Sequence, residues 1–127
     1  MKIVALDYGS ARTGVAISDP TGTIARPLGV VERASGEDGL RRLAELIRAE
    51  DAERVVVGLP LTLRGERGSQ AAETEAFVEA LRAAVDVPVE SFDERFTTRL
   101  AQSAPGPDDA RAAAHLLSSY LAWSSNR

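Results

Sequence analysis

Hydrophobic residues in the first third of the chain follow the two-residue period of β-strands. Residues 2–7 form a run that is apolar on both faces and ends at Asp7, which is typical of a central strand. Residues 15–18 and 24–31 predict two more strands, and the glycine-bounded turn between the first two lets them pair as a hairpin. Pro27 places the third strand at a sheet edge, because proline cannot donate a ladder hydrogen bond.

The hydrophobic period changes to 3.6 residues after position 35. A helix is expected behind a possible capping segment at 35–38, with an apolar stripe at Leu40, Leu43, Ala44 and Ile47. The remaining segments predict strands over 54–59 and 87–92, helices over about 70–84 and 108–123, and a short helix over 98–102. This β-β-β-α-β-α-β-α order predicts an α/β fold, in which a five-stranded mixed sheet carries helices on both faces.

The amino-acid composition excludes several classes of metal site and catalytic nucleophile. With 127 residues, the chain fits one domain spanning 1–127. It contains no cysteine and a single histidine, His115, which excludes thiolate zinc sites, cysteine nucleophiles and polyhistidine metal sites. By its helical angle, His115 is expected to be a partly exposed residue of the last helix. No targeting or membrane-spanning pattern is visible, so we expect a cytoplasmic protein.

Acidic residues stand at the ends of three predicted elements. Asp7 ends the first strand on the same face as Ile3 and Ala5, where it either starts the following turn or serves a site. Asp93 and Glu94 end the fifth strand, and adjacent strand residues point to opposite faces, so only one of them can share a site with Asp7. Asp109 heads the stripe of the last helix that should face the sheet, whereas Asp108 is better placed to cap that helix.

Three carboxylates from separate elements, without a histidine or cysteine cluster, suit a hard divalent cation. Mg²⁺ and Mn²⁺ prefer oxygen ligands and leave positions open for water and phosphate oxygens. Two such ions can activate a water and stabilise the leaving oxygen of a phosphodiester. The sequence therefore predicts a Mg²⁺ or Mn²⁺ site with two ions, provided that the acids converge.

The motifs around these acids resemble those of the YqgF family, also called RuvX. This family comprises pre-16S rRNA nucleases related to Holliday-junction resolvases of the ribonuclease H-like fold. The matching segments span residues 3 to 121, and they are Leu6-Asp7-Tyr8-Gly9 with Arg12 and Gly14-Val15-Ala16, Val57-Gly58-Leu59-Pro60-Leu61 with Gly65, Asp93-Glu94-Arg95 with Thr97-Thr98, and Asp109 with the apolar helix behind it. The Gly-Leu-Pro-Leu and Asp-Glu-Arg-x-Thr-Thr motifs are the specific ones.

The resemblance implies a metal-dependent endonuclease with a ribonuclease H-like fold. Its metal ligands would be Asp7, Glu94 and Asp109, with Asp93 as the alternative to Glu94. The arginines Arg12 and Arg95 would contact phosphate through paired hydrogen bonds. The hydroxyls of Thr97 and Thr98 would either contact the substrate backbone or cap the short helix. The implied partner is structured RNA, specifically the 5′ end of pre-16S rRNA in ribosomal precursors, or branched DNA.

The chain departs from the family in its charge. The stretch 101–107, before Asp109, is uncharged where family members carry a basic loop, so Arg64 and Arg67 are the nearest substitutes. The formal net charge is −4, which by itself disfavours nucleic-acid binding. Setting aside the four candidate acids leaves 15 acidic against 15 basic residues, so the rest of the protein is neutral. Bound metal ions would then supply most of the positive charge at the phosphate.

Other functions also agree with this sequence. The first is four-way junction cleavage, which needs the same carboxylates and a symmetric dimer; the sequence decides neither monomer nor homodimer. The second is a non-catalytic RNA-binding factor in ribosome assembly. The third is ATP binding, because Asp7-x-Gly9 with Gly14 also resembles the phosphate loop of sugar kinases and their relatives, although those proteins place ATP between two such domains.

Overall fold

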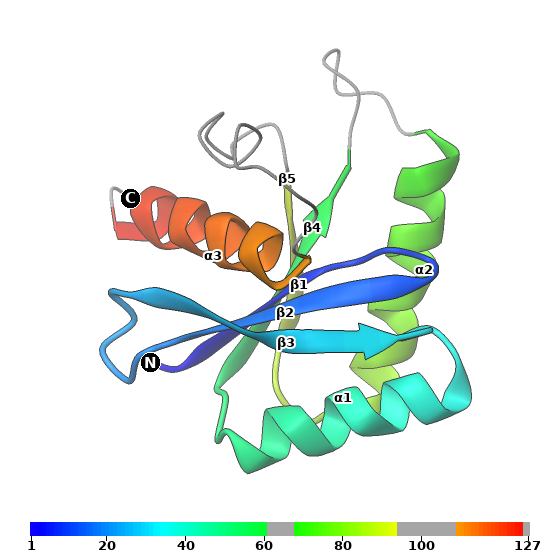
Figure 1. Ribbon diagram of the computed structural model, residues 1–127, viewed down its shortest axis with the longest axis horizontal. Helices are drawn as coiled ribbons and strands as arrows, with labels where there is room; N and C mark the ends of the chain where they lie inside the picture. The colour runs from blue at the N-terminus through cyan, green and yellow to red at the C-terminus, as the bar shows by residue number, and fades with distance from the viewer. Residues whose placement is uncertain (61–67, 94–108, 126–127) are drawn as a thin grey trace.

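The computed structural model describes residues 1–60, 68–93 and 109–125, which form one sheet and three helices (Figure 1). The strands are β1 (Ile3–Asp7), β2 (Arg12–Ser18), β3 (Ala25–Glu32), β4 (Arg54–Leu59) and β5 (Val89–Asp93). The helices are α1 (Glu37–Ala49), α2 (Ser69–Ala84) and α3 (Asp109–Ser125). The order of these elements is the one predicted from the hydrophobic pattern, while the short helix expected over 98–102 lies outside the described residues.

The sheet is mixed, with the spatial order β3-β2-β1-β4-β5. Strands β1, β2 and β3 form an antiparallel meander, whereas β4 and β5 run parallel to β1. The carboxyl ends of β1, β4 and β5 therefore lie at the same edge of the sheet. Strand β3, which contains Pro27, lies at an outer edge as predicted.

Helices cover both faces of the sheet, and two hydrophobic clusters fill the space beneath them. Helix α3 lies on one face, while α1 and α2 lie on the other (Figure 1). The cluster under α3 consists of Ile3, Ala5, Ala16, Val56, Phe92, Ala113, Leu116, Leu117 and Tyr120. The cluster on the opposite face includes Val4, Leu6, Val55, Val57 and Val89 from the sheet, with Leu43, Ile47, Phe77 and Leu81 from the helices. Alternation along each strand thus divides the core, which confirms the predicted fold class.

Strand β2 begins at Arg12, three residues before the predicted start, because the polar residue Thr13 is accommodated within the sheet. Thr13 is fully buried, and its hydroxyl lies 3.4 Å from the carbonyl oxygen of Gly9, to which it donates a hydrogen bond. This bond ties the turn after β1 to the start of β2. Residues 12–14 therefore belong to strand β2, although their composition is typical of a turn.

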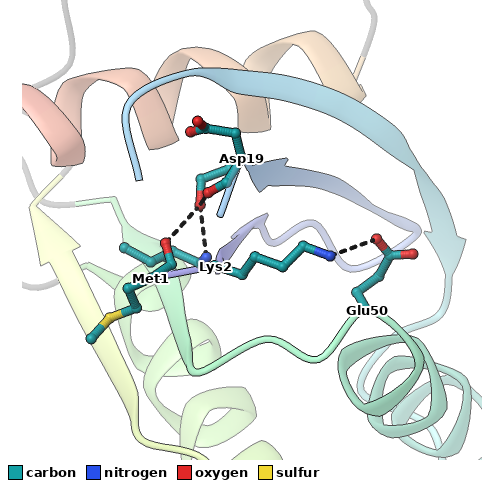
Figure 2. Close-up of polar contacts among 6 residues, drawn as sticks. Met1, Lys2, Asp19 and Glu50 are labelled. Carbon is teal, nitrogen blue, oxygen red and sulfur yellow. Dashed lines mark hydrogen bonds and ion pairs between the residues drawn. The ribbon is translucent and has the colours of Figure 1, made fainter. Parts of the chain in front are cut away.

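Helix α1 differs from prediction at its start. Its N-cap is Gly36, and no side chain caps the helix there. Two acidic residues in the first turn, Glu37 and Asp38, instead lie near the positive end of the helix dipole. At the other end of α1, Figure 2 shows Lys2 reaching Glu50, with 4.0 Å between the ammonium nitrogen and the carboxylate oxygen.

Within the described ranges, no helix combines the length and the apolar character needed to span a membrane.

Candidate active site

Asp7 is the last residue of β1, at the sheet edge where the three parallel strands end. It follows Ile3 and Ala5 in the two-residue alternation, and both of these pack under α3. The carboxylate of Asp7 is therefore directed to the α3 face, as the sequence predicted. In the ladder with β2, the Cα partner of Asp7 is Gly14.

Gly14, the ladder partner of Asp7, also lies against Asp109 at the start of α3. The start of α3 lies so close to Gly14 that a Cβ atom there would be 1.7 Å from the carbonyl oxygen of Asp109 and 3.0 Å from the nitrogen of Ala110. Directly paired residues of antiparallel strands have Cα atoms about 5 Å apart, so Gly14 is in contact with Asp109 and adjacent to Asp7. Glycine thus lets the first residue of α3 approach the end of β1.

Asp109 also has the orientation expected from its helical position. The residues of α3 that share its stripe, Ala113, Leu116 and Tyr120, are buried against the sheet. The Asp109 carboxylate lies 3.3 Å from the Nε atom of Arg12, which is the first residue of β2. The Arg12 side chain is 60% exposed and that of Asp109 31% exposed, so the ion pair faces solvent. A candidate phosphate-binding residue thus contacts a candidate metal ligand.

Asp93 lies at the same edge of the sheet but on the other face. It is the last residue of β5 and the ladder partner of Leu59. By alternation it shares a face with Val89, which packs in the α1 and α2 cluster, whereas Phe92 packs under α3. Asp7 and Asp93 therefore point to opposite faces of the sheet.

Several predicted residues lie outside the described part of the chain. These are Glu94, Arg95, Thr97, Thr98, Asp108, Arg64 and Arg67. His115, expected to be a partly exposed residue of the last helix, is half-buried on α3. Tyr120 is buried beside Phe92 and Trp123.

Comparison with known protein families decides the relationship. A model of the RuvX family, described as Holliday junction resolvase, matches residues 1–123. The chain belongs to this family. RuvX relatives include two proteins named "Putative pre-16S rRNA nuclease", from Chloroflexus aggregans (48% identical over 100 residues) and from Desulforudis audaxviator (47% over 98 residues). The aligned regions cover 79% and 77% of this chain, and 70% of each relative.

The fold of this RuvX chain is also that of a solved resolvase. RuvC of Thermus thermophilus, determined in complex with a Holliday junction substrate, superposes with a TM-score of 0.70. The match covers 99% of this chain and 96% of RuvC, at 18% sequence identity. The predicted ribonuclease H-like fold is thereby confirmed, and the nuclease names of the RuvX relatives agree with the predicted class of enzyme.

The donor set of this RuvX site suits a hard cation only in part. Asp7 and Asp109 offer carboxylate oxygens, which Mg²⁺ and Mn²⁺ prefer. Arg12 already places a positive charge beside Asp109, where a metal ion would also be stabilised. Within 1–60, 68–93 and 109–125, however, no three acidic or histidine side chains are grouped closely enough to hold a metal. The third ligand expected from the sequence, Glu94, lies outside these ranges.

Proposed function

We propose that this protein is a metal-dependent endonuclease that hydrolyses a phosphodiester bond at the 5′ end of pre-16S rRNA. The observation that carries the proposal is the approach of Asp7 and Asp109 around Gly14, at an edge of the sheet that they reach from opposite ends of the chain. The buried stripe of α3 begins at Asp109, and its packing on the sheet does not require a carboxylate at that position. The names of the RuvX relatives supply the substrate, and a nuclease acting on ribosomal precursors would work in the cytoplasm.

The proposed metal ligands are Asp7, Asp109 and Glu94. The position of Asp93 supports Glu94 as the third ligand, because Asp93 shares its face of β5 with Val89, away from Asp7. Two-residue alternation predicts that the next position returns to the face of Phe92, under α3. Glu94 occupies that position in the sequence. Asp93 is left as a candidate for holding Arg95.

The chemistry then divides between the ions and the chain. One or two Mg²⁺ or Mn²⁺ ions held by these carboxylates would supply an activated water and stabilise the leaving oxygen. Arg12, exposed beside Asp109, would donate hydrogen bonds to the phosphate of the substrate. Arg95, Thr97 and Thr98 are proposed to contact the substrate backbone next to the cleaved bond.

A cleavage panel with matched variants tests the proposal. Wild type, Asp7→Asn and Asp86→Asn are incubated with Mg²⁺ or Mn²⁺ and a pre-16S rRNA fragment, a single-stranded RNA or a four-way DNA junction. We expect Asp7→Asn to abolish cleavage while its thermal melt stays unchanged or improves, since a carboxylate that repels its neighbours is removed. Asp86 is exposed just before β5, at the other end of the sheet, so Asp86→Asn should cleave normally. Undiminished metal-dependent cleavage by Asp7→Asn would refute the assignment.

A second candidate function is cleavage of four-way DNA junctions. It is favoured by the description of the RuvX family as Holliday junction resolvase. This reaction requires two active sites related by a two-fold axis, because two strands are cut at symmetric points. Junction cleavage in the same panel, together with a dimer in sedimentation equilibrium, would select this function. RNA binding without turnover under any metal would instead indicate a non-catalytic assembly factor.

A further inference from the structure

A groove lies beside the candidate site, on the opposite face of the sheet edge from Asp7. Its volume is about 430 Å³, and its lining includes Tyr8, Ser10, Ser35, Glu73 and Phe77. These residues come from the turn after β1, the connection between β3 and α1, and helix α2. Tyr8 directly follows Asp7 in the sequence, so the groove begins one residue away from a proposed metal ligand.

Tyr8 gives this groove a rigid aromatic wall. The ring of Tyr8 stacks on that of Phe77, with centroids 4.4 Å apart and an angle of 21° between the planes. Phe77 is 2% exposed and fixed in the core, whereas Tyr8 is half-buried and keeps part of its surface in the groove. An aromatic ring that is already held in place loses little conformational freedom when a flat ligand stacks on it.

The polar groups of the groove favour a nucleobase over a phosphate. No lysine or arginine is found among the described residues that line it, and the carboxylate of Glu73 would repel a phosphate. A carboxylate accepts hydrogen bonds from the amino groups of bases, as in the pairing of glutamate with the N4 amino group of cytosine. The hydroxyls of Ser10 and Ser35 can donate or accept. Uracil carries no amino group, and its one ring donor, N3–H, lies between two carbonyl oxygens that the Glu73 carboxylate would repel.

We infer that this groove binds a base of the RNA substrate, in a single-stranded stretch next to the cleaved phosphodiester, and that it prefers an amino-bearing base to uracil. A strand that crosses the sheet edge would present its phosphate on the α3 side, near Asp7, and an adjacent base on the α2 side, against Tyr8. Stacking on aromatic side chains is the usual way in which proteins hold unpaired bases. The inference rests on the proposed nuclease function.

Binding of short RNAs to cleavage-deficient protein tests the groove. All variants carry Asp7→Asn, and the probes are 12-nucleotide single-stranded RNAs with one 2-aminopurine each, placed at successive positions, in Mg²⁺ buffer. The parent should change the fluorescence of one position strongly. Tyr8→Phe should behave like the parent, whereas Tyr8→Leu should lose that signal and bind about fivefold or more weakly. Trp123→Leu is the matched control, because Trp123 is an exposed aromatic residue at the far end of α3 and should leave binding unchanged.

Base preference supplies a second readout that does not disturb the core. RNAs with cytosine or uracil at the position found above should differ by about two- to tenfold in affinity for the parent. Glu73 is exposed, so Glu73→Gln should fold normally and remove most of that difference. If both the signal and the affinity survive in Tyr8→Leu, or if the parent shows no preference, the groove proposal is overturned. If the parent binds no RNA and the wild type cleaves none, the proposed function falls as well.

Discussion

Gly14 of β2 holds Asp109 of α3 at a distance that only glycine allows. Any side chain at position 14 would collide with backbone atoms of the first turn of α3. Backbone atoms cannot rotate away from a collision as the flexible end of a side chain can. We predict that Gly14→Ala displaces the start of α3 and lowers the free energy of unfolding by about 1–3 kcal/mol, the usual cost of overpacking. Cleavage should fall much further than stability, because Asp109 moves away from Asp7.

Gly29→Ala provides the control for this prediction. Gly29 lies in β3, and a Cβ atom there would meet nothing within 4 Å. This substitution should be neutral or stabilise by up to about 1 kcal/mol, since alanine restricts the unfolded chain. Urea unfolding and cleavage assays on both variants make the comparison. Normal activity in Gly14→Ala would show that the close approach does not position Asp109.

Arg12→Gln should separate metal binding from substrate binding. The pair of Arg12 with Asp109 is exposed, so its loss should change the free energy of unfolding by less than about 1 kcal/mol. Removing a cation from Asp109 should tighten Mn²⁺ binding by at most about fivefold, as measured by calorimetry. Affinity for RNA should fall, and its dependence on salt should weaken by about one phosphate contact.

Arg41→Gln is the matched control for Arg12→Gln. Arg41 pairs with Asp38 on α1 at 2.6 Å and is equally exposed, but it is remote from the candidate site. Its replacement should alter neither metal affinity nor the salt dependence of RNA binding. Equal effects of the two substitutions would mean that net charge, and not position, is responsible.

Tyr120 should make the protein sensitive to alkali. Burial, together with the hydrogen bond that its hydroxyl donates to Glu90, raises the pKa of Tyr120 above its ordinary value of 10.0. Arg54 in turn donates to the Tyr120 hydroxyl at 2.9 Å. A raised pKa means that the stabilisation is complete below the unfolded value and is lost as the pH rises through the folded value.

Absorbance titration near 295 nm checks this, because Tyr8 and Tyr120 are the only tyrosines. One tyrosine should ionise late and together with unfolding, and Tyr120→Phe should remove that event. The same substitution should cost about 1 kcal/mol at neutral pH, since Arg54 and Glu90 lose a partner but remain partly solvated. If the late ionisation persists in Tyr120→Phe, it belongs to a group other than Tyr120.

Asp19 should contribute to stability in the opposite pH range. Its carboxylate accepts backbone hydrogen bonds from Ile24 at 2.9 Å and Thr23 at 2.7 Å, and a further one from the Thr21 hydroxyl. These bonds, with that of Ile24 the largest cause, lower the pKa of Asp19 well below its ordinary value of 3.8. The stabilisation that Asp19 contributes is therefore complete above the ordinary pKa of 3.8. It is lost as the pH falls from there towards the lower pKa of the folded state. Urea midpoints from pH 6 to 3 should fall less steeply in Asp19→Asn than in wild type.

Much of the fold and part of the site could be predicted from the pattern of side chains. Alternation along the first strand directed Asp7 to one face, and the helical stripe behind Asp109 directed that carboxylate to the sheet. Both predictions depend on local periodicity, which the chain obeys because each face of the sheet is buried. The edge position of β3 followed equally from Pro27, whose missing donor excludes it from a central strand.

Other features depend on contacts that no local pattern contains. Val89 and Phe92 are both apolar and lie on opposite faces of β5, so the sequence could not decide which of Asp93 and Glu94 shares a face with Asp7. The sequence places Gly14 at the boundary of a turn, and only the structure shows that the start of α3 packs against it. Tyr8 appeared only as part of a motif, because its stacking partner Phe77 is 69 residues away in the chain.

The pairing of Asp7 with Asp109 also has a consequence for synthesis of the protein. Asp109 follows Asp7 by 102 residues in the chain. Because domains generally fold as units during translation, the sheet edge that carries Asp7 gains its partner only after Asp109 has been synthesised. A nascent chain that stops short of Asp109 therefore lacks half of the proposed site while it is held on the ribosome, next to the class of RNA that the enzyme is proposed to cut.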